Sequence, residues 1–335
     1  MTFSDKMIKF FNQKKIINVL FIAAVGILIL NLLLDKFFLP APDEENIEIT
    51  SAEIDSTFRS GLFNLGIHEE WIKKQNKNSD NLSVLVPKDL PFVLILQEMN
   101  NVFDTNEVKI KSIEKKIGGR TTLNFISGEE DKLNADLIYN EKVRRKTVRV
   151  GFIVKRIDGP DETDSLLTGY PEQFAFLLIP SNNSANFVKK VITSGKEYIL
   201  YLNDEIGELK YRLKENYSAI RLKNSVREIV GTFPGAVFFM IDDKSQVYNS
   251  GVYPLLKDEL EKRKIKLVEE SSFKSLSVSA DENLFETFNN TLDNLEGGED
   301  KIYIITAENF LQLNSEIIRY RKLGYRFTNP SALSF

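Results

Sequence analysis

The chain has 335 residues, of which 42% are hydrophobic and 27% charged, and its formal net charge is −4, from 44 basic and 48 acidic residues. This near balance gives no electrostatic reason to expect a nucleic-acid partner. The sequence has no cysteine, which excludes disulfides, a thiolate nucleophile and cysteine-ligated zinc, and its one histidine, His68, is fewer than hydrolytic zinc sites usually require.

An apolar run near the N-terminus predicts a membrane anchor over residues 16–38. The stretch from Ile16 to Leu34 contains no charged residue. A helix rising about 1.5 Å per residue would make this stretch about 29 Å long, close to the thickness of the hydrocarbon core of a bilayer. Lysines dominate residues 1–15 and acidic residues follow the run. The positive-inside bias therefore puts the N-terminus in the cytoplasm and the rest of the chain outside.

Two other interpretations of this run are weaker. A cleaved signal peptide usually has a shorter apolar region and a small-residue cleavage site, which the sequence after residue 34 does not offer. A buried helix rarely stays apolar on every face over such a length. We therefore predict a single-pass protein of the bacterial inner (cytoplasmic) membrane, with its main domains periplasmic or extracytoplasmic.

A small α/β domain is predicted over residues 47–141, after a linker at 39–46. Helical patterns cover 47–74, with Gly66 as a plausible end, and 90–103; strand patterns cover 82–87, 108–114, 121–126 and 134–139. The domain shows no catalytic pattern. His68 is interpreted as an ordinary residue near a helix end, because a metal site would need further ligands.

The second domain is predicted over residues 147–335. A basic run at 142–149 leads into it, and we interpret this run as a solvated edge, with binding to phosphate or an anionic polymer as the alternative. Short, nearly all-apolar strands then alternate with helices, which is typical of a mostly parallel sheet or barrel covered by helices. The predicted strands are 148–154, 174–179, 198–202, 236–240, 265–268, 302–305 and 325–327, and the helices are 184–194, 223–231, 252–264, 282–295 and 308–323.

The order of motifs from Val148 to Phe335 resembles the divergent polysaccharide deacetylase family, relatives of the NodB-type carbohydrate esterases. Pro180 ends the second predicted strand as in that family, and the closing Gly-Tyr-x-Phe-x-x-x-Ser at 324–331 fits the family's end. The resemblance implies a distorted (β/α) barrel, with a functional site at the carboxyl ends of its strands.

The residues that carry chemistry in this family are replaced in this chain. The family's first strand ends in a pair of Asp residues, where this chain has Lys155 and Arg156. Its third strand ends in His-x-Pro-Met-Glu, where the chain reads Tyr201 to Glu205 and only Glu205 matches, and Phe239 stands in place of another family His. Family members use Asp and His ligands to hold a divalent metal that activates water. The resemblance therefore implies an inactive member with no catalytic residue, no metal and no cofactor.

The replaced positions and the neighbouring strand ends define a candidate groove. Its predicted members are Lys155, Arg156, Tyr201, Glu205, Phe239, Asp242, Asp243 and Glu269. Asp242 and Asp243, with acidic residues at neighbouring strand ends, could form an all-oxygen site for Mg²⁺ or Ca²⁺. Adjacent strand residues point to opposite faces, which argues against that site. The rings of Tyr201, Phe238, Phe239 and Tyr248 could stack on a sugar or simply fill the core.

These features support three hypotheses about function. The first is a membrane-anchored cell-envelope protein whose inactive deacetylase-like domain binds a glycan or a protein partner. The second is an active metal-dependent carbohydrate deacetylase with a rearranged carboxylate site. The third is a structural subunit of a membrane-associated envelope assembly. The first and third differ in whether the groove over Tyr201 and Phe239 is open or filled by side chains.

Overall fold

The computed structural model of the protein describes residues 19–30, 49–75, 81–105, 107–114, 118–156, 161–276 and 283–333. Residues 19–30 of the predicted anchor form a helix with exposed side chains. The rest of the predicted anchor and the whole predicted linker lie in 1–18 and 31–48, outside the described residues. Within the described ranges, no helix is both long and apolar enough to cross a membrane.

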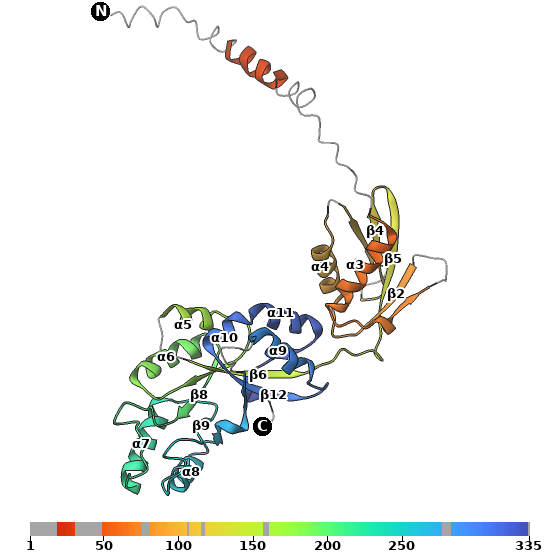
Figure 1. Ribbon diagram of the computed structural model, residues 1–335. Coiled ribbons are helices and arrows are strands. Elements are labelled where there is room, and N and C mark those ends of the chain that lie inside the picture. Colours follow the sequence, from red (N-terminus) through yellow and green to blue (C-terminus); the bar gives the residue numbers. More distant parts are fainter. Residues whose placement is uncertain are drawn as a thin grey trace, which may run out of the picture.

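The remaining described residues form two α/β units, each built around its own sheet (Figure 1). In the first unit the strand order is β1-β2-β5-β4-β3, and helices α3 and α4 contribute to its core. Its elements are α3 (Ser51–Phe63), β1 (Ile72–Lys74), β2 (Asn81–Val86), α4 (Phe92–Val102), β3 (Lys109–Glu114), β4 (Thr121–Ser127) and β5 (Glu130–Tyr139).

The core of the small unit follows from the alternation along its strands. In β4, Leu123 and Phe125 are fully buried and pack with Phe58 of α3, while the side chains between them lie half-exposed on the other face. The predicted helix over 47–74 is too long. The helix ends at Phe63, and the chain then turns at Gly66, which has a φ of 73°, before Ile72–Lys74 pairs with β2 as an antiparallel strand.

The second unit contains eight described strands, all paired in parallel, in the order β10-β9-β8-β7-β6-β12-β11, with β13 beside β6. The strands are β6 (Arg149–Lys155), β7 (Ala175–Leu178), β8 (Glu197–Leu202), β9 (Phe239–Ile241), β10 (Leu267–Glu269), β11 (Lys274–Ser275), β12 (Asp300–Thr306) and β13 (Arg326–Phe327). The helices are α5 (Asp161–Thr168), α6 (Asn182–Thr193), α7 (Ala219–Thr232), α8 (Tyr253–Glu261), α9 (Leu284–Asp293), α10 (Ala307–Gln312) and α11 (Asn314–Leu323).

This sheet curls until its two ends approach each other. β10 and β11 stand at opposite ends of the strand order, yet only residues 270–273, with the short helix η2 (Glu270–Ser272), separate them in the chain. The inner face carries one cluster of side chains, which includes Ile153, Met240 and Phe273. The outer face packs against the helices through a larger cluster. The architecture is therefore an α/β half-barrel filled by its own side chains.

Each predicted strand of the second unit overlaps an observed one, although several boundaries shift. The sequence did not predict α5 or β11. The predicted helix over 308–323 is two helices, because α10 ends at Gln312 and α11 begins at Asn314.

Candidate functional site

The carboxyl ends of the parallel strands bring together part of the predicted groove. Along β6, Ile153 lies in the inner cluster and Val154 in the outer one, so the alternation turns Lys155 inward. Tyr201, near the end of β8, also belongs to the inner cluster. The Lys155 ammonium lies 4.9 Å from the centroid of the Tyr201 ring. At this range the cation is attracted by the electrons of the ring face.

Tyr201 is held from the other side by Glu270. Its hydroxyl donates a hydrogen bond to a carboxylate oxygen of Glu270, the first residue of η2. Burial raises the pKa of Tyr201, and the carboxylates of Glu270, Asp242 and Glu205 raise it further because a phenolate would be repelled by them. Tyr201 is therefore a neutral hydrogen-bond donor at physiological pH.

The carboxylates around this mouth are already engaged by the chain. Asp242 Oδ1 accepts a hydrogen bond of 2.9 Å from the Lys244 amide, and Glu205 accepts one of 3.0 Å from the Asn203 side-chain amide. Among the residues that the structure describes, no group of three or more histidine or acidic side chains could hold a metal ion. An ammonium and a phenol among these acids do not fit the divalent metal that active members of the resembled family hold.

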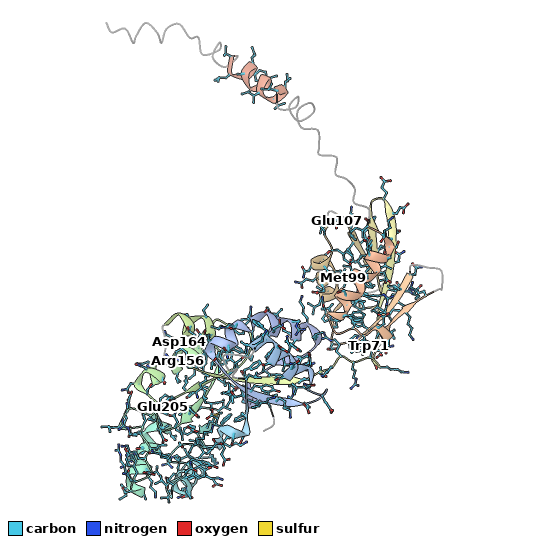
Figure 2. All side chains as sticks on the ribbon, in the orientation of Figure 1. Trp71, Met99, Glu107, Arg156, Asp164 and Glu205 are labelled. Carbon is cyan, nitrogen blue, oxygen red and sulfur yellow. The ribbon has the colours of Figure 1, made fainter. Side chains whose placement is uncertain are left out.

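Three predicted groove residues face the helices instead of the mouth. Arg156 forms two hydrogen bonds of 2.8 Å with the carboxylate of Asp164 in α5, and its guanidinium lies 4.6 Å from the Phe187 ring centroid (Figure 2). Phe239 is buried in the outer cluster. Burial and the nearby Glu269 carboxylate raise the pKa of Tyr253 at the start of α8, so Glu269 lies on the helix side.

The physical reason for this separation is the period of two along a strand. Neighbouring residues at the end of a strand, such as Lys155 and Arg156, point to opposite sides. The Glu269 carboxylate and, to a smaller extent, burial and the charges of Glu269, Tyr253 and Asp243 raise the pKa of Tyr248, which packs against the outer cluster. Of the predicted groove, Lys155, Glu205 and Asp242 act on Tyr201 at the mouth.

Three of the four rings considered for stacking on a sugar are inside the protein, and the fourth, Tyr248, is half-buried. Tyr201, Phe238 and Phe239 are 3%, 1% and 2% exposed, so they fill the two faces of the sheet. Glu270, which was not a member of the predicted groove, is the residue that completes the mouth. The signal that could have found it is its position directly after a short apolar strand, one step beyond Glu269.

No protein-family model and no curated protein matches the sequence. Solved structures similar to this chain include members of carbohydrate esterase family 4. One is a pseudoenzyme of that family from Bacillus anthracis (TM-score 0.39, 10% identity, covering 63% of this chain and 74% of that chain). Another is the catalytic domain of a peptidoglycan N-acetylglucosamine deacetylase from Eubacterium rectale (TM-score 0.39, 9% identity, covering 56% and 90%). A third is PdaA from Bacillus subtilis (TM-score 0.34, 14% identity, covering 56% and 80%).

The predicted resemblance names the same group of proteins, relatives of carbohydrate esterases. The likeness concerns the fold alone, so what the barrel mouth does has to follow from its own residues.

Proposed function

We propose that the protein is a non-hydrolytic, membrane-tethered protein of the bacterial envelope, whose deacetylase-like barrel serves as a scaffold for a protein partner. The observation that carries this proposal is the arrangement of Lys155, Tyr201 and Glu270 at the barrel mouth. The Lys155 ammonium balances the negative charge of the surrounding carboxylates. Two unit charges about 4 Å apart repel by about 4 kcal/mol near a protein surface, so a divalent cation beside Lys155 is disfavoured.

The burial of the mouth supports a protein partner over a glycan held in the groove. Tyr201 is 3% exposed, and Phe239, which the sequence placed in the same groove, is buried on the opposite face among the helices. A sugar needs an open aromatic face for stacking. A filled barrel instead presents its outer helices and loops, which suits a structural role in an assembly.

A metal and activity assay on the full chain in detergent micelles tests the absence of hydrolysis. We expect less than stoichiometric zinc by elemental analysis and no acetate release from chitooligosaccharides or peptidoglycan fragments. Asp242→Asn separates the alternatives, because an active carboxylate site would lose acetate release in that variant. Stoichiometric zinc together with acetate release that stops on chelation would overturn the proposal.

The tether is tested separately in cells. The apolar run from Ile16 to Leu34 and the lysines before it support an uncleaved anchor with the domains outside. We expect the intact chain to resist carbonate extraction from membranes, and protease added to spheroplasts to digest its domains. A shortened chain released into the soluble extracytoplasmic fraction would contradict the anchor.

A further inference from the structure

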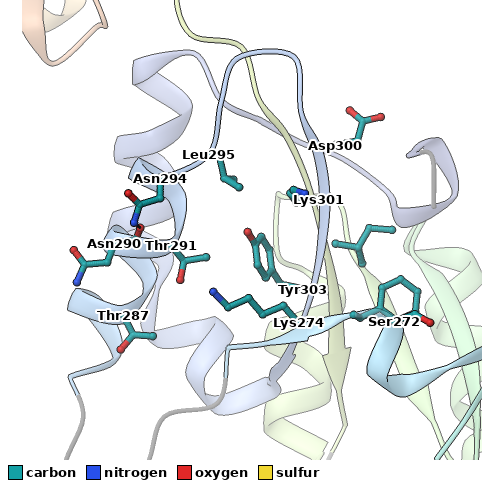
Figure 3. Close-up of a pocket in the computed structure, with 12 residues that line it drawn as sticks. Ser272, Lys274, Thr287, Asn290, Thr291, Asn294, Leu295, Asp300, Lys301 and Tyr303 are labelled. Carbon is teal, nitrogen blue, oxygen red and sulfur yellow. Dashed lines mark hydrogen bonds between the residues drawn. The ribbon is translucent and has the colours of Figure 1, made fainter. Parts of the chain in front are cut away.

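A polar cavity opens on the seam of the barrel, away from the mouth. β11 contains two residues and pairs only with Tyr303 and Ile304 of β12. The first part of β12, from Asp300 to Ile302, has no partner strand on that edge among the described strands. A cavity of about 760 Å³ lies there, between α9 and the start of β12 (Figure 3). Its volume is in the range of small-molecule binding sites.

One wall of this seam pocket is an uncharged polar stripe of α9. The stripe has the spacing of one helix face, and each side chain ends in a hydroxyl or an amide. Its members are Thr287, Asn290 and Thr291, together with Asn294 directly after the last residue of α9. The opposite stripe of α9, which includes Phe288 and Leu292, is buried in the core. Hydroxyls and amides both donate and accept hydrogen bonds, so this wall suits a ligand rich in hydroxyl groups.

The other wall supplies positive charge. Lys274, in β11, extends its ammonium toward the α9 stripe (Figure 3), and Lys301 lines the same cavity. Neither lysine has an ion-pair partner among the residues that the structure describes. Asp300, the one carboxylate in the described lining, points away from α9 and is paired with Arg149 through a 2.7 Å hydrogen bond. The cavity is therefore electrostatically suited to an anion.

Tyr303 provides a donor at the base of the cavity. The residue is 3% exposed, and burial together with the charge of Glu299 raises its pKa to about 12, so the hydroxyl keeps its proton at neutral pH. The hydroxyl is directed toward α9 (Figure 3) and makes no hydrogen bond with any described residue. A hydroxyl that lines a cavity and has no protein acceptor there can donate its hydrogen bond to water or to a ligand.

We propose that the seam pocket binds a polyhydroxylated anion, either a sugar acid or a sugar phosphate. Lys274 and Lys301 would neutralise the anionic group, the Asn and Thr side chains of α9 would bind the hydroxyls, and Tyr303 would donate to an oxygen deep in the site. A neutral sugar would leave the ammonium groups without a counter-charge. The inference stands apart from the proposed scaffold function, because no residue of the barrel mouth contributes to it.

Calorimetric titration of the full chain in detergent micelles tests this site with four probes. These are glucuronate, glucose 6-phosphate, glucose and inorganic phosphate. We expect one of the two anionic sugars to bind at least tenfold more tightly than glucose and than inorganic phosphate, and the preferred one identifies the anionic group. Inorganic phosphate that binds as tightly as the sugar phosphate would overturn the polyhydroxylated part of the proposal.

Two variants and a control locate the binding. Lys274 is exposed, so Lys274→Met is expected to keep the fold and to lower the affinity for the anionic sugar at least tenfold. Tyr303→Phe is expected to weaken it severalfold with an unchanged unfolding temperature. Lys257→Met removes an exposed lysine of α8 and is expected to leave the affinity unchanged. The absence of binding by both anionic sugars, or binding that survives Lys274→Met, would refute the site.

Discussion

Arg145 donates a hydrogen bond of 2.8 Å from Nη1 to the main-chain oxygen of Lys322, near the end of α11. The same nitrogen donates a second hydrogen bond, of 3.1 Å, to the main-chain oxygen of Leu65, and Nη2 donates one of 2.7 Å to a carboxylate oxygen of Asp89. The guanidinium is almost buried, with 8% of the side chain exposed. One side chain from the connecting segment therefore satisfies carbonyl groups of both domains and fixes the contact between them.

Removing this guanidinium is expected to uncouple the two domains. Arg145→Ala loses hydrogen bonds made by a charged donor, each contributing about 1.5–3 kcal/mol, and leaves Asp89 without its partner. We expect thermal unfolding to separate into two calorimetric transitions and trypsin to cut faster between 140 and 147. Arg144→Ala, which changes the exposed neighbour, is the control. A single transition at the temperature of the unmodified protein would contradict the role of Arg145.

Gly66 lies at the same contact between the two units, and we predict that this position tolerates no side chain. Its φ is 73°, and a Cβ would lie 2.6 Å from the main-chain oxygen of Leu323. Gly118 has a similar φ of 69°, and a Cβ added there would have nothing within 4 Å, so Gly118→Ala measures the backbone cost alone. That cost is about 1 kcal/mol. We expect Gly66→Ala to lose at least about 1 kcal/mol more unfolding free energy than Gly118→Ala, as measured by urea unfolding. Equal losses in the two variants would show that the contact with Leu323 is dispensable.

A pH dependence is predicted for the small domain from Asp136. Hydrogen bonds from Arg120, Thr122 and Gln75 lower its pKa to about 2, well below the range of about 3.9 expected in the unfolded chain. Because the folded pKa is depressed, its contribution is fully present above about pH 4 and is lost as the pH falls toward 2. We expect this carboxylate to contribute about 2 kcal/mol at neutral pH.

Asp136→Asn checks this assignment, since the amide cannot titrate. The difference in unfolding free energy between the unmodified protein and the variant should be constant from pH 5 to 7 and shrink as the pH is lowered below about 4. A difference that does not change with pH would mean that the Arg120 pair contributes nothing through the charge of Asp136.

Most of the fold could be predicted because its strands are short and apolar and its helices amphipathic. β11 could not, since Lys274 and Ser275 carry no apolar pattern and become a strand only through pairing with β12. α5 was missed for a related reason. Its sequence is mostly polar, and Leu167 is the fully buried apolar residue that it contributes to the core.

The site was predicted in part for an equally physical reason. Motif order identified which residues stand at strand ends, and Lys155 and Tyr201 do meet at the mouth. Motif order does not say which side of the sheet a residue faces, so Arg156 was placed with Lys155 although strand alternation separates them. The partner of Tyr201 depends on where η2 crosses the mouth, and this is a tertiary relationship that the local sequence does not encode.

Arg156 and Asp164 form a buried pair whose loss is predicted to be costly. Their side chains are 11% and 8% exposed, and two hydrogen bonds of 2.8 Å join them. Arg156→Met leaves the Asp164 carboxylate buried without this partner, which should cost about 3–5 kcal/mol in urea unfolding. The double variant Arg156→Met with Asp164→Leu should recover part of that loss, because no uncompensated charge remains.

Arg149→Met is the matched control. Its ion pair with Asp300 involves an arginine side chain that is 46% exposed, so its loss should cost about 1 kcal/mol or less. Equal losses in Arg156→Met and Arg149→Met would show that the buried pair does not hold α5 against the barrel.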